Sequence, residues 1–311
     1  MEKNSPKLRA NIIRYGYAAA LFSSVAYSLW DIALYSSVGI SGAAYLLSLP
    51  FIYVFAILFS GLFVLVSTSA YKGKVSFSRK MLWYAFVEGA LYALFTIFLL
   101  YAFTYSDLFP LTISSIYVST FIFAFMVKRF NRSKVSISYF VATAIVVLGL
   151  MLESNFLTPI SSISIVYLGV MCLIVAIYAL AIYYSFYPMY LGYTAGSFML
   201  AEFVMEFIVA LPIILIFGAH NVGLLLSPNL LKYIIFAGLL LFLGWLSDLY
   251  SFHFVRKAKA NVIDTANILA DLELFGVAIY SIIFMHVSPV PMLISTFLII
   301  SGIVMLHKVK V

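Results

Sequence analysis

The stretch NVIDTANILADLELF, residues 261–275, places three carboxylates and two asparagines in an otherwise apolar sequence. It follows the basic turn RKAKA, residues 256–260, and leads directly into another apolar run. Taken alone, this pattern would fit the start of a soluble amphipathic helix. The sequence on either side decides between a soluble helix and a membrane-spanning one.

The composition of the chain excludes a soluble protein. Of its 311 residues, 65% are hydrophobic and only 9% are charged, and the mean hydropathy is +1.13. Soluble domains carry about 25% charged and about 45–50% apolar residues. A membrane-spanning helix needs about 20 apolar residues, so the chain has room for about ten such helices and little else. The sequence therefore predicts an all-α polytopic membrane protein.

Apolar runs bounded by charged or turn residues predict ten membrane-spanning helices. The N-terminal segment is basic and precedes a long apolar run without a small-residue cleavage site, so we interpret it as a prefix to an uncleaved first span. The predicted spans are residues 15–37, 43–70, 81–105, 108–130, 136–152, 162–187, 196–219, 231–255, 261–285 and 289–307.

The basic residues predict the orientation of these spans. If ten spans alternate across the membrane, seventeen of the eighteen Lys and Arg residues fall on one side, and only Lys232 falls on the other. Basic loops stay in the cytoplasm, so we expect a multi-pass plasma-membrane protein with both termini cytoplasmic. Contact with anionic lipid explains the net charge of +7 better than nucleic acid does. The oligomeric state is left open by the sequence.

Five spans in each half would be inverted relative to each other, and the sequence carries traces of such a repeat. YAFTY (101–105) and YSFHF (250–254) each precede a turn and a polar-studded apolar run, and the halves end in VVLGLML (146–152) and IISGIVML (299–306). The expected organisation is a cytoplasmic segment 1–14, a first five-helix repeat 15–153, an external linker 154–161, a second five-helix repeat 162–307 and a cytoplasmic tail 308–311.

Three short motifs stand out: the turn KAKAN (257–261), the run DLELFGVAIYSIIFMH (271–286) and SLWD (28–31). With these motifs the chain resembles the drug/metabolite transporter superfamily, in its EamA-like ten-helix branch, and the resemblance is best in the last two spans of each half. KAKAN and the run 271–286 are similar to that family's alanine-rich turn and acidic run, with Glu273 at the acidic position, and SLWD is similar to the LWG of the first family helix, with Asp31 in place of glycine. The resemblance implies a secondary transporter of small metabolites, built from inverted five-helix repeats around a central cavity.

Eight carboxylates fall within the predicted spans, and no Lys or Arg lies deep in any span. A charged acid near the membrane midplane costs at least about 2.5–3.5 kcal/mol. These side chains are therefore expected to be protonated, to face a wet cavity, or to meet a cation from solution. The alternative is a purely structural role, in which a protonated acid only forms a hydrogen bond to a neighbouring helix. The eight are Asp31, Glu88, Glu202, Glu206, Asp248, Asp264, Asp271 and Glu273.

Helical periodicity separates the polar residues of the opening stretch into two faces. Asp264, Asn267 and Asp271 fall on one stripe, and we expect them to bind substrate or protons. Glu273 falls on nearly the opposite face, so we interpret it as a structural residue in a helix-packing contact.

The remaining candidate site residues lie in other spans. Glu202 and Glu206 are one helical turn apart, and two carboxylates so close in a low-dielectric region do not both ionise easily. Such a pair can bind and release a proton. Aromatic side chains beside a polar face can also hold a cation. The candidate substrate- and proton-binding residues outside the opening stretch are Asp31, Glu88, Glu202, Glu206, Asp248, Tyr27 and Trp30.

The absence of other motifs narrows the function. The sequence has no phosphate-binding loop and no protease or hydrolase motif, and its one cysteine, Cys172, joins no Cys/His cluster. We therefore expect no enzyme activity, no cofactor and no metal site. Carriers of organic anions need Arg or Lys in the cavity, and none is available here.

These observations predict a secondary active transporter, a proton-coupled exporter that works by alternating access through an acid-lined central cavity. Its substrate would be a small metabolite, an amino acid or a cationic amine, exchanged for protons or other cations. The alternative is a channel or carrier for an inorganic cation such as Mg²⁺, although Mg²⁺ sheds its water reluctantly.

Overall fold

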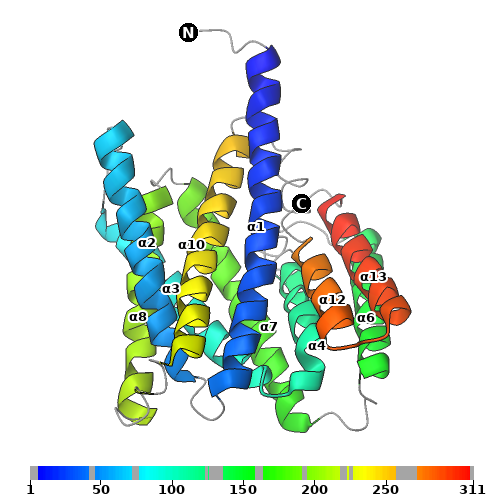
Figure 1. Cartoon of the computed structure of the whole chain (residues 1–311). Helices are drawn as coiled ribbons and strands as arrows, with labels where there is room; N and C mark the ends of the chain where they lie inside the picture. The colour runs from blue at the N-terminus through cyan, green and yellow to red at the C-terminus, as the bar shows by residue number, and fades with distance from the viewer. Residues whose placement is uncertain are drawn as a thin grey trace.

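A computed structural model of the chain describes residues 6–41, 46–71, 77–122, 125, 136–157, 164–190, 195–217, 223, 227–256 and 272–308. These residues form a bundle of α-helices (Figure 1). The helices are α1 (Pro6–Ser41), α2 (Ser48–Tyr71), α3 (Arg79–Ala102), α4 (Phe109–Ile116), α6 (Ile137–Leu157), α7 (Ile165–Tyr190), α8 (Ala195–Phe217), α10 (Pro228–Arg256), α12 (Glu273–Phe284) and α13 (Pro289–Lys308), with a short 3₁₀ turn, η2 (Ser106–Leu108), before α4.

Seven helices among the described residues are long and apolar enough to cross a membrane. Three shorter apolar helices accompany them, over Phe109–Ile122, Ile165–Ala181 and Glu273–Phe284. Large apolar side chains also cover the outside of the bundle: Leu215 is 80% exposed and Ile137 is 82% exposed. A soluble protein does not leave such a surface in water. The prediction of a polytopic helical membrane protein is therefore confirmed.

Local sequence explains where several helices begin. Ser78 caps α3, because its hydroxyl accepts a hydrogen bond of 3.1 Å from the backbone N–H of Met81. Pro110 lies in the first turn of α4 and Pro289 begins α13, positions at which a missing N–H costs nothing. Helix α6 ends at Leu157, beyond the predicted end of the fifth span at residue 152, and this extension brings Glu153 into the bundle.

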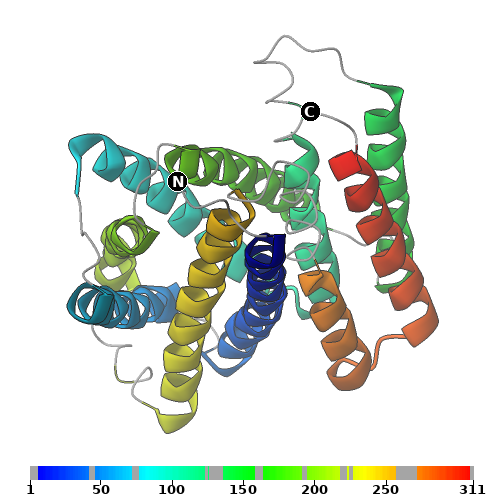
Figure 2. The ribbon, with the colours of Figure 1, turned by 90° about the horizontal axis from the view of Figure 1, so that it is seen from above.

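The helices pack in a regular pattern of pairs (Figure 2). Helix α1 runs along α10, and α3 runs along α7. Helix α2 contacts α8 and α10, and α3 also contacts α8. Helix α6 lies against α13, α12 contacts α1 and α4, and α4 contacts α7. Figure 1 shows α1 beginning, and α2, α10 and α13 ending, toward the upper side of the bundle.

Two glycines let helices approach until their backbones touch. A methyl group at Gly89 of α3 would lie 2.8 Å from the backbone oxygen of Glu202 in α8, and one at Gly238 of α10 would lie 2.8 Å from that of Ile52 in α2. Each glycine also meets a Cβ atom and a backbone nitrogen three and four residues further along the partner helix. Small residues at such crossings are typical of helix association in membranes.

The contact between α6 and α13 uses one glycine from each helix. Gly149 approaches the backbone oxygen of Ser295, and Gly302 approaches the backbone oxygen of Ala142. Both glycines come from the similar sequences VVLGLML and IISGIVML that end the two halves.

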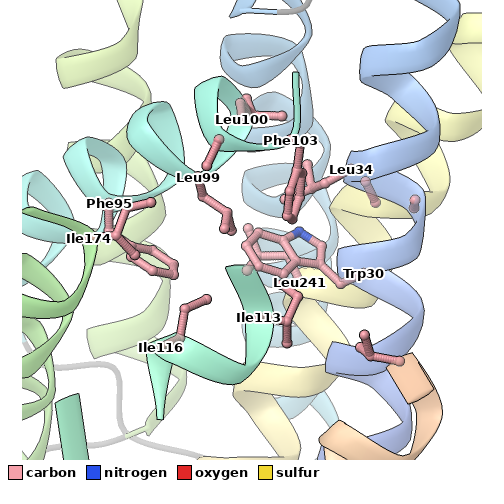
Figure 3. Close-up of a cluster of buried hydrophobic side chains, with 14 of the residues drawn as sticks. Trp30, Leu34, Phe95, Leu99, Leu100, Phe103, Ile113, Ile116, Ile174 and Leu241 are labelled. Atoms are coloured by element: carbon pink, nitrogen blue, oxygen red, sulfur yellow. The ribbon is translucent and has the colours of Figure 1, made fainter. Parts of the chain in front are cut away.

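The apolar core fills the space between the helix pairs. Figure 3 shows Trp30 of α1 surrounded by apolar side chains of α1, α3, α4 and α10. Its side chain is 3% exposed. The other labelled residues of this apolar cluster are Leu34, Phe95, Leu99, Leu100, Phe103, Ile113, Ile116, Leu241 and Ile174, the last from α7.

The glycine contacts predict large effects of single methyl groups. Gly89→Ala and Gly238→Ala should each lower the thermal unfolding temperature in detergent, because overpacking costs about 1–3 kcal/mol. Gly61→Ala on α2 is the control, since nothing lies within 4 Å of a methyl group there. Equal unfolding temperatures for all three variants would contradict the packing described.

Candidate functional site

Several carboxyl groups lie in the interior of the bundle, among buried serine and threonine side chains. Five of them are at most 2% exposed: Asp31, Glu88, Glu153, Glu202 and Glu206. Asp248 and Glu273 are half-buried. The basic side chains that the structure describes are all exposed, namely Arg14, Arg79, Lys80 and Lys232. Within the described part of the chain, no lysine or arginine therefore neutralises the buried acids.

Three of the acids form one cluster, which we call the carboxyl triad: Glu88 of α3 with Glu202 and Glu206 of α8. The close approach at Gly89 carries Glu88 against α8. Glu202 lies within hydrogen-bonding reach of the other two carboxyls, and the indole N–H of Trp245 in α10 donates a hydrogen bond to its Oε2 atom. The triad thus connects three helices.

The contacts of the triad require protons within it. An ionised carboxylate only accepts hydrogen bonds, so a hydrogen bond between two carboxyls requires a proton on one of them. Glu202 also accepts from Trp245, and this extra donor favours the negative charge on Glu202. We therefore assign the protons to Glu88 and Glu206. Oε2 of Glu88 and both oxygens of Glu206 are buried and accept no hydrogen bond from any donor group among the described residues.

A second cluster, the Asp31–Glu273 pair, joins α1 to α12. The two carboxyls are within hydrogen-bonding reach, and Tyr117 also hydrogen-bonds to Glu273. Ser28 donates a hydrogen bond of 2.9 Å to the backbone carbonyl of Glu273. Gly276 allows this approach, because a methyl group there would lie 2.6 Å from the Cβ atom of Ser28. A hydrogen bond between these two carboxyls requires a proton on one of them.

The structure changes the interpretation of Glu273. The sequence predicts a helix-packing residue turned away from the other acids. Glu273 does pack α12 against α1, and it does so through the carboxyl of Asp31. Helix α12 begins at Glu273, so its side chain lies in the first turn, where a negative charge is favourable.

Tyr27 lies between the two clusters. Its hydroxyl is within electrostatic range of Asp248, Glu202 and Glu273. Its ring packs against Gly244 of α10, where a methyl group would lie 3.0 Å from a ring carbon. Asp248 is on the buried face of α10 and within electrostatic range of Glu273. Tyr27 of α1 therefore lies against α10, the helix that carries Asp248.

Trp30 lies apart from the acids, within the apolar core. Its indole nitrogen has no hydrogen-bond partner in the described part of the chain. The ring centroid of Trp30 is 6.5 Å from that of Tyr27 and 6.3 Å from that of Tyr92, which connects it to the aromatic side chains beside the triad.

Glu153 is a buried acid that the sequence analysis missed, because the fifth span was expected to end one residue earlier. Its Oε1 atom accepts a hydrogen bond of 3.1 Å from Ser114 of α4. Thr112 and Tyr167 share a hydrogen bond of 2.9 Å nearby. The helical sequence continues without a breaker as far as Pro159, and this continuity was the available signal.

Three predicted site residues, Asp264, Asn267 and Asp271, lie outside the described residues. Their proposed common stripe stays a prediction. No arrangement of three or more His, Cys, Asp or Glu side chains suited to a metal ion occurs in the described ranges.

Comparisons with known proteins add no assignment to this geometry. No model of a known protein family matches the sequence, and no curated protein is significantly similar to it.

The hydrogen bond from Trp245 gives a direct prediction. Trp245→Phe removes a donor to a buried carboxylate, and hydrogen bonds to charged groups contribute about 1.5–3 kcal/mol. The variant should unfold at a clearly lower temperature than the wild type in detergent at neutral pH. Trp83→Phe is the matched control, because Trp83 is 61% exposed and such surface changes stay within about 0.5 kcal/mol. Equal unfolding temperatures for the two variants would contradict a stabilising hydrogen bond from Trp245 to Glu202.

Proposed function

We propose that the protein is a proton-coupled secondary transporter that exports a small amine, a cationic metabolite or an amino acid across the plasma membrane. The observation that carries the proposal is the contact between buried carboxyls without a buried basic partner among the described residues. Groups in this state hold protons that a solution cation can replace. Ionisable groups inside membranes mark ion and substrate pathways.

The packing supports an architecture of two inverted five-helix repeats. If α1 is exchanged with α7, α2 with α8, α3 with α10, α4 with α12 and α6 with α13, the pairs described above map onto one another. The pair α1 and α10 becomes α7 and α3, and the pair α2 and α10 becomes α8 and α3. The pairs α2 with α8, α4 with α12 and α6 with α13 map onto themselves. Inverted repeats of this kind permit alternating access.

The glycine contacts support the same exchange at atomic detail. Gly89 meets the backbone oxygen of Glu202, the Cβ atom of Met205 and the backbone nitrogen of Glu206. Gly238 meets the same three kinds of atom at the same spacing in α2, from Ile52, Phe55 and Ala56.

The positions of basic residues support cytoplasmic termini. The upper side of the bundle in Figure 1 holds the start of α1 and the ends of α2, α10 and α13, where the sequence is rich in Lys and Arg. Lys232, the one exception, lies at the opposite end of α10. Positively charged loops favour the cytoplasmic side.

The resemblance to the drug/metabolite transporter superfamily agrees with this proposal. Two positions depart from the family pattern, Leu274 in place of proline and His286 in place of glutamate. Within this frame, the Asp31–Glu273 pair and Asp248 exchange protons for substrate, because the pair joins α1 to α12 and Asp248 of α10 is within electrostatic range of Glu273. Asp264, Asn267 and Asp271 precede α12 in the sequence and belong to the same proposed pathway.

Transport in proteoliposomes with an imposed pH gradient tests the proposal. A panel of small amines and amino acids should include a substrate whose flux is driven by the gradient. Combining Asp31→Asn with Glu273→Gln should reduce that flux by about tenfold or more, since each hydrogen-bonded charged group contributes about 1.5–3 kcal/mol. Asp107→Asn, at an exposed acid between α3 and α4, is the control and should leave the flux unchanged.

Two results would contradict the proposal. One is flux that ignores the pH gradient in the wild type. The other is large, non-saturating currents of Mg²⁺ or another inorganic cation, which would identify a channel instead.

A further inference from the structure

The carboxyl triad has a counterpart in the other half of the bundle, and that counterpart is apolar. The exchange that maps Gly89 onto Gly238 also maps Glu88 onto Ala237, Glu202 onto Ile52 and Glu206 onto Ala56. These three apolar residues are buried, with at most 1% of their surface exposed. One geometry of helix contact therefore exists in two versions, with three acids in one and none in the other.

This comparison separates the fold from the chemistry. The contact between α10 and α2 shows that close packing of two helices at such a glycine does not need carboxyls. Buried polar clusters are often neutral or unfavourable for stability relative to apolar packing. The triad is therefore an addition to a sufficient apolar contact, and its acids require another explanation.

We propose that Glu88, Glu202 and Glu206 form a second proton-binding site, separate from the Asp31–Glu273 pair. While this site holds two protons it keeps α3 packed against α8, and when a proton leaves the two helices separate. We call this arrangement the clasp. The inference rests on the proposed function and assigns it a regulatory site. Its ligand is the proton, because each carboxyl of the triad is at most 2% exposed.

Counting protons explains the clasp. With protons on Glu88 and Glu206, both carboxyls donate to Glu202, which also accepts from Trp245, and the cluster carries one negative charge. Removal of either proton replaces a hydrogen bond with two adjacent carboxylates. Their repulsion is barely screened away from water. The two charges lie on α3 and α8, or one turn apart on α8, so the repulsion acts across or beside the Gly89 contact.

The charge of the triad depends on the three acids themselves, because the groups around them carry no charge at neutral pH. The other titratable side chains that face them are tyrosines: Tyr53 of α2, Tyr92 of α3 and Tyr27 of α1, with Tyr178 of α7 beside Tyr27 and Tyr92. No lysine, arginine or histidine in the described part of the chain faces the triad. Tyr27 is also within range of Glu273 and Asp248, so it places the clasp in electrostatic contact with the proposed transport site.

The distance between α3 and α8 as a function of pH tests the clasp without any substrate. Cys172 is the sole cysteine in the sequence, so Cys172→Ser provides a cysteine-free background. Spin labels at Phe86→Cys and Ile208→Cys, both at outward-facing positions, report on α3 and α8 in lipid nanodiscs. A comparison pair at exposed positions, Phe236→Cys and Leu58→Cys, reports on the apolar counterpart, α10 and α2.

The expected result is a longer α3–α8 distance as the pH rises, with no such increase between α10 and α2. Glu88→Gln with Glu206→Gln mimics the protonated acids and should keep the short distance at every pH. The apolar triple variant, Glu88→Ala with Glu202→Ile and Glu206→Ala, should fold and also lose the response.

Several outcomes would overturn the clasp: a wild-type distance that is constant over the pH range, a response that persists in the glutamine variant, or equal responses in both helix pairs. Failure of the proposed function is distinguishable from these. If the distance responds but no pH gradient drives flux, the clasp stands without transport. If flux is proton-coupled but the distance is constant, transport stands without the clasp.

Discussion

The structure depends on one electrostatic constraint: carboxyl groups lie inside an apolar bundle where the described residues offer no cation to balance them. Burying an isolated charge is costly, so such groups stay neutral, share protons or bind cations. In this bundle they lie close enough to share protons with one another. Glu88 and Glu206 lie against Glu202, and Asp31 lies against Glu273. The helix contacts that bring these acids together therefore also determine how many protons the protein holds.

Glycine makes these contacts possible. Gly89 brings α3 close enough to α8 for Glu88 to reach Glu202, and Gly276 does the same for α12 and α1 beside Asp31. The matching contact at Gly238 joins α10 to α2 through apolar residues alone. The α3–α8 and α10–α2 contacts have the same geometry, and only the first contains carboxyl groups. The packing of the bundle can therefore stay unchanged while one half gains groups that bind protons. This division links the fold to the proposed coupling of proton movement and transport.

The sequence predicted much of this fold, because long apolar runs and the placement of basic residues are strong signals. It also identified Glu202 and Glu206 as neighbours, since they are one turn apart on one helix. It did not predict that Glu88 joins them, because that contact crosses between helices distant in the chain. Periodicity placed Glu273 away from the other acids of its own stretch, but it carried no information about Asp31 of α1. Glu153 was missed because span ends are the weakest part of such predictions.

The most direct test of the account is infrared spectroscopy of the purified protein in lipid at neutral pH. Only a protonated carboxyl gives a carboxylic C=O stretching band, so the spectrum reports which acids hold protons. The account predicts such bands from buried acids in the wild type, weaker bands in Glu88→Gln with Glu206→Gln, and a further loss in Asp31→Asn. A wild-type spectrum without any carboxylic band, with every carboxyl ionised, would contradict it.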